Sequence, residues 1–135
     1  MIRALILALT IYWEARGEQW EGQLAVATVI FNRSIQRGIR IETICLEPKQ
    51  FSCWNILPDG PTAQFSFENA AQPYKLDATF HRCLGLAYAM IQHPELFQPT
   101  GPWNHYYNPA LCNPAWAKEM TDVKKIGAHI FGCAK

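Results

Sequence analysis

The chain has 135 residues and a mass of 15.4 kDa, which is the size of one domain, and half of its residues are hydrophobic. That hydrophobic content excludes a disordered regulator, and a domain of this length buries enough surface to fold without a disulfide or a metal. Lysine and arginine exceed aspartate and glutamate by only one charge. Non-specific nucleic-acid binding depends on an excess of basic residues, so we expect no nucleic-acid partner.

The first 47 residues contain no proline and predict two helices. In the first, Leu7, Ile11 and Glu14 share one face, and Gly17 is its predicted end. A second helix is predicted over Trp20 to Arg37, ending at Gly38. The apolar residues 1–13 also resemble a short signal peptide. They are too few to span a membrane and lack an ordinary cleavage site, so we interpret them as helix and expect no stable membrane insertion.

The remainder alternates between irregular segments and regular elements. Residues 48–73 and 94–114 are rich in proline and are predicted to be long loops, which are commonly functional in compact domains. A third helix is predicted over Leu76 to Gln92, and the β-branched residues of the tail predict a small hairpin. The predicted fold class is mainly α with a small β-hairpin region, in a single domain over residues 1–135, and we expect a monomer.

Two carboxyl groups near the first helix are candidates for chemistry. Glu14 lies on the same face as Leu7 and Ile11, so packing would place it against apolar surface. Burial favours the protonated form of a carboxyl, which is the form that a general acid for glycoside cleavage requires. Glu18 is a candidate second carboxylate of a glycosidase pair. The structural alternatives are a Glu14–Arg16 ion pair and a Glu18 that satisfies backbone N–H groups at a helix start.

Other polar and aromatic residues offer weaker signals. His105, Cys112, His129 and Cys133 have spacings that match no standard zinc site, so no metal is expected. The five cysteines are an odd number and contain no C-x-x-C motif, which is typical of small buried thiols in a reducing compartment. The aromatic residues of the loops are candidates for stacking on sugar rings, or for ordinary packing: Trp54, His105, Tyr106, Tyr107 and Trp116.

Three ordered sequence blocks resemble the spore-cortex-lytic/cell-wall hydrolase family. The first is EARGE at residues 14–18, followed by GQLAVA at 22–27 and the pair Asn32-Arg33. The second is Gln50-Phe51-Ser52 with Trp54, and the third comprises HYYN at 105–108, Trp116 and the segment 126–131. The blocks follow the family's order and extend over nearly the whole chain.

The resemblance implies a lysozyme-like fold shared with lytic transglycosylases and cleavage of the β-1,4 bond between N-acetylmuramic acid and N-acetylglucosamine in peptidoglycan. It implies that Glu14 is the catalytic acid and that no metal or cofactor takes part. It further implies that the second and third blocks line the glycan cleft, which makes the following residues candidate substrate contacts: Gln50, Phe51, Ser52, Trp54, His105, Tyr106 and Trp116.

Several alternatives to this reading remain open. A lytic transglycosylase would close a 1,6-anhydro ring with the muramic acid 6-hydroxyl, whereas a lysozyme-type muramidase would use water and a second group such as Glu18. A glycan-binding or virion module without activity, and a zinc amidase, are further alternatives. Because the motif begins at residue 14, we expect a phage endolysin made in the cytoplasm without a cleaved signal and released to the cell wall through a holin lesion.

Overall fold

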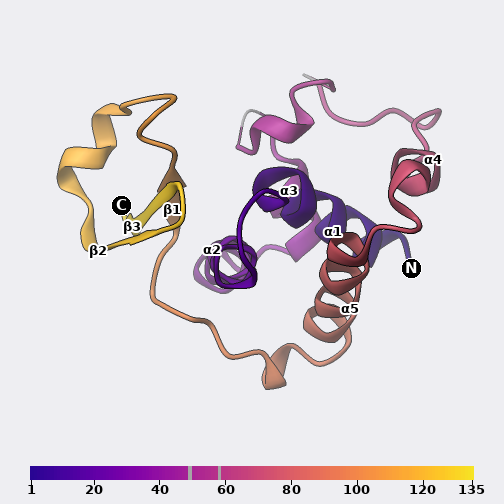
Figure 1. The fold of residues 1–135 in the computed structure, drawn as a ribbon, viewed down its shortest axis with the longest axis horizontal. Coiled ribbons are helices and arrows are strands. Elements are labelled where there is room, and N and C mark those ends of the chain that lie inside the picture. Colours follow the sequence, from indigo (N-terminus) through magenta and orange to yellow (C-terminus); the bar gives the residue numbers. More distant parts are fainter. Residues whose placement is uncertain (49, 58) are drawn as a thin grey trace.

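The computed structural model describes residues 1–48, 50–57 and 59–135, which form a mainly helical domain with one small sheet (Figure 1). The helices are α1 (Ile2–Ala15), α2 (Trp20–Arg37), α3 (Ile41–Leu46), α4 (Phe67–Ala71) and α5 (Ala78–Gln92). Short 3-10 turns are η1 (Ser52–Trp54), η2 (Gln72–Tyr74), η3 (Pro94–Leu96) and η4 (Ala115–Glu119). The strands are β1 (His105–Tyr107), β2 (Thr121–Ile126) and β3 (His129–Cys133).

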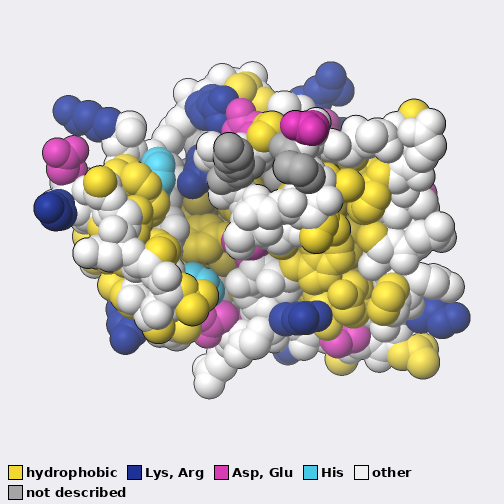
Figure 2. Space-filling model, turned by 90° about the horizontal axis from the view of Figure 1, so that it is seen from above, with side chains coloured by type: hydrophobic (Ala, Val, Ile, Leu, Met, Phe, Trp, Pro, Cys, Tyr) yellow, Lys and Arg dark blue, Asp and Glu magenta, His cyan; other side chains and the backbone are white. Residues whose placement is uncertain are grey.

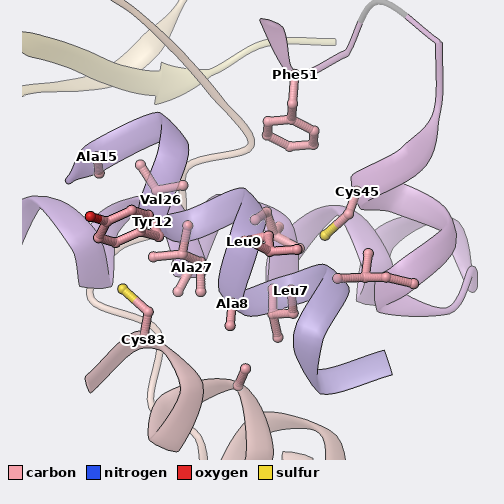
Figure 3. Packing of buried hydrophobic residues seen from close by; sticks show 14 of the residues in the cluster. Leu7, Ala8, Leu9, Tyr12, Ala15, Val26, Ala27, Cys45, Phe51 and Cys83 are labelled. Atoms are coloured by element: carbon pink, nitrogen blue, oxygen red, sulfur yellow. The ribbon is translucent and has the colours of Figure 1, made fainter. Parts of the chain in front are cut away.

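Helix α1 is the centre of the domain. Every residue from Ala4 to Tyr12 is buried, because α2, α3, α4 and α5 all contact this helix. A helix that is apolar on all sides is stable only when it is surrounded in this way. Figure 3 shows Leu7 and Leu9 of α1 within the core, with Val26 of α2 and Cys83 of α5 close by.

The predicted helices agree closely with the observed ones. Helix α2 has the predicted bounds and ends at Gly38, whose φ of 63° is the left-handed conformation that glycine adopts readily. Helix α5 begins two residues later than predicted, because the Asp77 carboxylate caps it by accepting a hydrogen bond from the Phe80 N–H at 3.1 Å. The sequence analysis missed α3, and it missed α4 inside the segment predicted to be a loop.

The predicted C-terminal hairpin is β2–β3, and a third strand joins it. Strand β1 pairs antiparallel with β3, with Tyr106 opposite Phe131, so the strand order is β1-β3-β2. The sheet lies on the far side of α2 from the other helices in Figure 1, and both β1 and β2 contact α2. This placement brings the HYY segment to the side of the molecule where α1 ends.

The five cysteines are all free thiols in the described structure. Cys45 and Cys83 are buried in the core, and burial raises the pKa of the Cys45 thiol to about 12. These two residues therefore act as small apolar side chains, as predicted, whereas Cys53 and Cys133 are only partly buried and the prediction is wrong for Cys112, which is exposed. Among the residues described, no helix is long and apolar enough to cross a bilayer.

Candidate functional site

A cleft of about 680 Å³ opens between the end of α1, the η1 loop and the sheet. Figure 2 shows the surface hollowed between the two sides of the molecule, with hydrophobic side chains at the bottom of the hollow. The cleft combines charged, polar and aromatic side chains, including Trp13, Glu14, Glu18, Arg33, Gln50, Ser52, Asn55, Tyr106, Tyr107, Asn108, Trp116 and His129. A concave site with a few convergent polar groups is the usual form of a ligand-binding cleft.

Glu14 stands in the last turn of α1, where its carboxylate is held by three donors. Oε2 accepts hydrogen bonds from the Cys53 backbone N–H at 3.1 Å and from the Ser52 hydroxyl at 3.2 Å. Oε1 accepts a hydrogen bond from the Tyr106 hydroxyl. The sequence argument placed this carboxyl against apolar surface, but the structure places polar donors from two distant segments around it. The carboxyl is therefore fixed in direction while remaining at the cleft surface.

Tyr106 is the strand residue that reaches this carboxyl. Its ring is packed on the sheet between Phe51 and Phe131, with ring centroids 6.4 and 5.4 Å away. Burial, and then the nearby Glu14 carboxylate, raise the pKa of the Tyr106 hydroxyl well above its usual value. The hydroxyl therefore keeps its proton and stays a hydrogen-bond donor to Glu14.

Glu18, the candidate second carboxylate, is attached to the turn between β2 and β3. Its Oε1 accepts hydrogen bonds from the Ala128 backbone N–H and from Nδ1 of His129, both at 2.9 Å. The side chain is only 15% exposed. His129 in turn packs edge-on against Tyr106 at 5.3 Å. Glu18 thus connects, through Oε1, the start of α2 to the sheet that carries Tyr106.

Gly127 leaves the space that this arrangement needs. Its φ is +58°, and a Cβ at this position would lie 2.2 Å from Oε2 of Glu18. We expect Gly127→Ala to cost about 1–2 kcal/mol for the left-handed backbone alone, and more from displacing Glu18. The measurement is thermal unfolding, with Gly38→Ala as the control, because Gly38 has a similar left-handed φ of +63° but a Cβ there meets no atom within 4 Å. Equal unfolding temperatures for the two variants would contradict this account of Glu18.

The residues predicted to contact substrate divide into three groups. Gln50, Ser52, Tyr106 and Trp116 line the cleft. His105 lines a neighbouring hollow of about 230 Å³ and packs on Trp116 at 4.9 Å. Phe51 and Trp54 are only 1% and 5% exposed and belong to the core beneath the cleft.

The burial of Phe51 and Trp54 has a physical reason. The η1 turn points both rings inward, where Trp54 donates a hydrogen bond from Nε1 to the Thr10 hydroxyl of α1 at 2.8 Å. Inside that core, the Trp54 ring also contacts Trp13 and Phe67. Their place in the structure is therefore beneath the residues that line the cleft.

Sequence reasoning missed several lining residues. Trp13, Asn55, Asn108 and His129 all reach the cleft. Tyr107, a candidate for stacking on sugar rings, lines it too and packs edge-on against Trp116 at 5.8 Å. Asn108 and His129 belong to motif segments quoted for the family resemblance, so that signal was present without a substrate-binding role attached. Nothing in the local pattern marked Trp13 or Asn55.

The candidate zinc residues do not converge. His129 is bonded to Glu18, whereas Cys133 donates its thiol to the Pro102 carbonyl at 3.3 Å. Within residues 1–48, 50–57 and 59–135, no group of three or more histidine, cysteine, aspartate or glutamate side chains is arranged to hold a metal ion.

Comparisons with known proteins identify a family and several relatives. A family model described as Cell Wall Hydrolase matches residues 17–132. The spore cortex-lytic enzyme of Bacillus cereus is 29% identical over 128 residues, and that of Halalkalibacterium halodurans is 30% identical. Each alignment covers 93% of this chain but only 42% and 33% of those enzymes, so the chain spans less than half the length of these curated relatives.

Two solved structures are also similar. The catalytic domain of the germination-specific lytic transglycosylase SleB from Bacillus anthracis has a TM-score of 0.65 and 27% identity, over 96% of this chain and 93% of that one. The catalytic domain of the Bacillus cereus SleB protein gives the same TM-score at 26% identity, over 96% and 88% of the two chains.

Proposed function

The chain belongs to the cell wall hydrolase family, and from this premise we propose that it degrades peptidoglycan as a lytic transglycosylase. The bond cleaved is the β-1,4 linkage from N-acetylmuramic acid to N-acetylglucosamine, and residues 1–135 act as a single catalytic domain. The observation that carries the proposal is the Glu14 carboxyl at the cleft surface, held by donors from η1 and β1. The similarity to a lytic transglycosylase catalytic domain over nearly its full length supports it.

In the proposed mechanism, Glu14 acts first as an acid and then as a base. Its proton passes to the glycosidic oxygen as the bond to the anomeric carbon breaks, giving an oxocarbenium-like muramic acid ring. The muramic acid 6-hydroxyl then attacks the anomeric carbon, and its proton returns to the Glu14 carboxylate. The ring closes as a 1,6-anhydro sugar, no water is consumed, and the enzyme is regenerated.

The position of Glu18 favours this route over hydrolysis. Among the described residues that line the cleft, the acids are Glu14 and Glu18, and the Glu18 side chain is only 15% exposed and is anchored through Oε1 to the sheet by the Ala128 N–H and His129. A muramidase would need a second group, either to activate a water molecule or to attack the anomeric carbon itself. A lytic transglycosylase instead uses the 6-hydroxyl of the bound substrate, which is present at high effective molarity. We therefore propose that Glu18 holds the β2–β3 turn and is not a second catalytic carboxylate.

The products of digestion distinguish these reactions. We expect fragments released from purified peptidoglycan to end in 1,6-anhydro-muramic acid, which resists borohydride, whereas hydrolysis leaves reducible ends. Mass spectrometry before and after borohydride treatment is the measurement. A digest with only reducible muramic acid ends would make the protein a muramidase, and cleaved stem peptides on intact glycan would make it an amidase. Binding without any released fragment would make it a glycan-binding module.

The biological setting is a separate part of the proposal. Lysis of the host cell from within, as an endolysin released by a holin, is predicted from the sequence alone, whereas the relatives compared are named for the spore cortex. Expression in a host with and without a holin tests it, and prompt lysis is expected only with the holin. Activity on purified wall without holin-dependent lysis would remove the endolysin role and leave the enzyme assignment intact.

A further inference from the structure

Arg33 of α2 lies where the catalytic cleft meets the smaller hollow beside it. It lines both cavities, as does Gln50. Its guanidinium carbon is 5.3 Å from the centre of the Phe51 ring. The face of an aromatic ring attracts a cation at this distance. The residue is half-buried, and burial lowers the pKa of its guanidinium from the usual value. Arginine nevertheless stays charged in proteins.

The partners of this cation are all neutral. Nε donates to the Asn104 carbonyl at 2.6 Å, and Nη1 donates to Oε1 of Gln50 at 3.4 Å. Arg37, one helical turn later, forms two hydrogen bonds of 2.6 and 2.8 Å with the Glu47 carboxylate. No carboxylate in the described part of the chain pairs with Arg33. Burying a cation without a counter-ion is costly, and an anionic ligand bound beside Arg33 would offset part of that cost.

Other titratable side chains line the smaller hollow beside Arg33, but Arg37 is already paired with Glu47. His105, Arg37 and Lys135 line that hollow together with Arg33. The charge of Arg33 contributes, after burial, to lowering the pKa of the His105 ring. On the side of the main cleft, the acids Glu14 and Glu18 are both engaged by donors of their own. Arg33 is thus the cation of this region that has no carboxylate partner among the described residues, and its planar guanidinium fits a carboxylate through two parallel hydrogen bonds.

We propose that Arg33, assisted by Gln50, binds a carboxylate carried by the glycan substrate and so makes the enzyme selective for anionic peptidoglycan. This inference rests on the proposed function and specifies the substrate class for the same cleft. Peptidoglycan offers two sources of this group: the carboxylates of the stem peptide, and the lactyl carboxylate of muramic acid, which is free only where the stem has been removed. Neutral glycan of the same backbone lacks both.

Three preparations of one purified wall test the proposal. The first is native wall, the second is wall whose carboxylates have been converted to neutral amides with carbodiimide and glycinamide, and the third is wall stripped of stems by an amidase. Wild-type kcat/KM for fragment release is expected to be about 10- to 100-fold lower on the amidated wall, the range for one lost charge-assisted contact. A rate on stripped wall as low as on amidated wall assigns the stem carboxylate, whereas a retained rate shows that the lactyl carboxylate exposed by stem removal is bound in its place.

Substitution of Arg33 separates recognition from stability. Arg33→Gln is expected to lower activity on native wall to the level of the amidated wall, so that the ratio between the two substrates approaches one. Arg33→Lys keeps the charge without the planar fork and is expected to give an intermediate ratio. Arg40→Gln is the matched control, because Arg40 is 78% exposed and its ion pair with Glu42 is long, at 3.8 Å. This variant should keep the wild-type ratio of rates.

The ratio of rates makes the outcome independent of general damage to the enzyme. A variant that is merely less stable loses activity on both walls alike and keeps the wild-type ratio, which would overturn the proposal. So would a wild-type enzyme that digests native and amidated walls equally well, a comparison that needs no variant at all. Failure of the wild-type enzyme to release fragments from any of the three walls would instead contradict the proposed function.

Discussion

Replacing Glu14 with glutamine is expected to abolish wall lysis while leaving the fold intact. Glutamine keeps the size of the side chain and an acceptor oxygen for the Cys53 N–H, and its NH2 can donate to the Tyr106 hydroxyl oxygen, but it has no acidic proton to transfer to the leaving sugar. General acid–base catalysis is typically worth about 10²–10⁴-fold. Because the proposed mechanism uses Glu14 in both proton transfers, we expect a loss of about 10⁴-fold or more.

Turbidity of a wall suspension and release of soluble fragments measure this loss, and thermal unfolding checks the fold. Glu21→Gln is the matched control, since Glu21 lies in the first turn of α2 with a side chain 65% exposed. Its activity should stay at the wild-type level. The activity of Glu18→Gln should lie between those of Glu14→Gln and Glu21→Gln. This variant should also be less stable, because its contacts to Ala128 and His129 are weakened. A Glu14 variant that clears walls at the wild-type rate would show that the acid lies elsewhere.

The sequence predicted the helices that have long, regular patterns and a clear end. Helix α2 has eighteen residues and stops at Gly38, and the apolar run of α1 continues for most of its length. Helix α3 has only six residues, too few for a helical period to stand out. Strand β1 has three residues and exists because it pairs with β3, more than twenty residues later. Such a pairing depends on tertiary structure and leaves no local signal.

The candidate site shows the same division between local and distant information. The motif marked Glu14, but the sequence did not show that Cys53 and Tyr106 would donate to it from segments about 40 and 90 residues away. Glu18 was separated from Glu14 by a glycine, so its direction depended on where the β2–β3 turn would dock. Aromatic residues were the hardest to assign, because a ring in a loop motif can line a cleft, as Trp116 does, or fill the core, as Trp54 does.

Truncation of Trp54 is the substitution with the largest expected effect on stability. Trp54 is 5% exposed, donates a hydrogen bond to Thr10 of the central helix and contacts the rings of Trp13 and Phe67. Truncating a buried tryptophan typically costs about 3–5 kcal/mol, which is a large share of a native stability of about 5–15 kcal/mol. We therefore expect Trp54→Ala to unfold at much lower denaturant concentration or not to fold at all.

Trp116 provides the contrast, because its half-buried ring lines the cleft and packs on His105 and Tyr107 at the edge of the sheet. Trp116→Ala should retain most of its stability and lose affinity for the wall. Trp54→Phe keeps a large ring but removes the donor to Thr10, and we expect it to fold with an intermediate loss of stability and near-normal activity per folded molecule. Denaturant unfolding and wall binding, measured on all three variants, separate the two roles. A Trp54→Phe variant of wild-type stability that no longer bound the wall would place Trp54 among the substrate contacts after all.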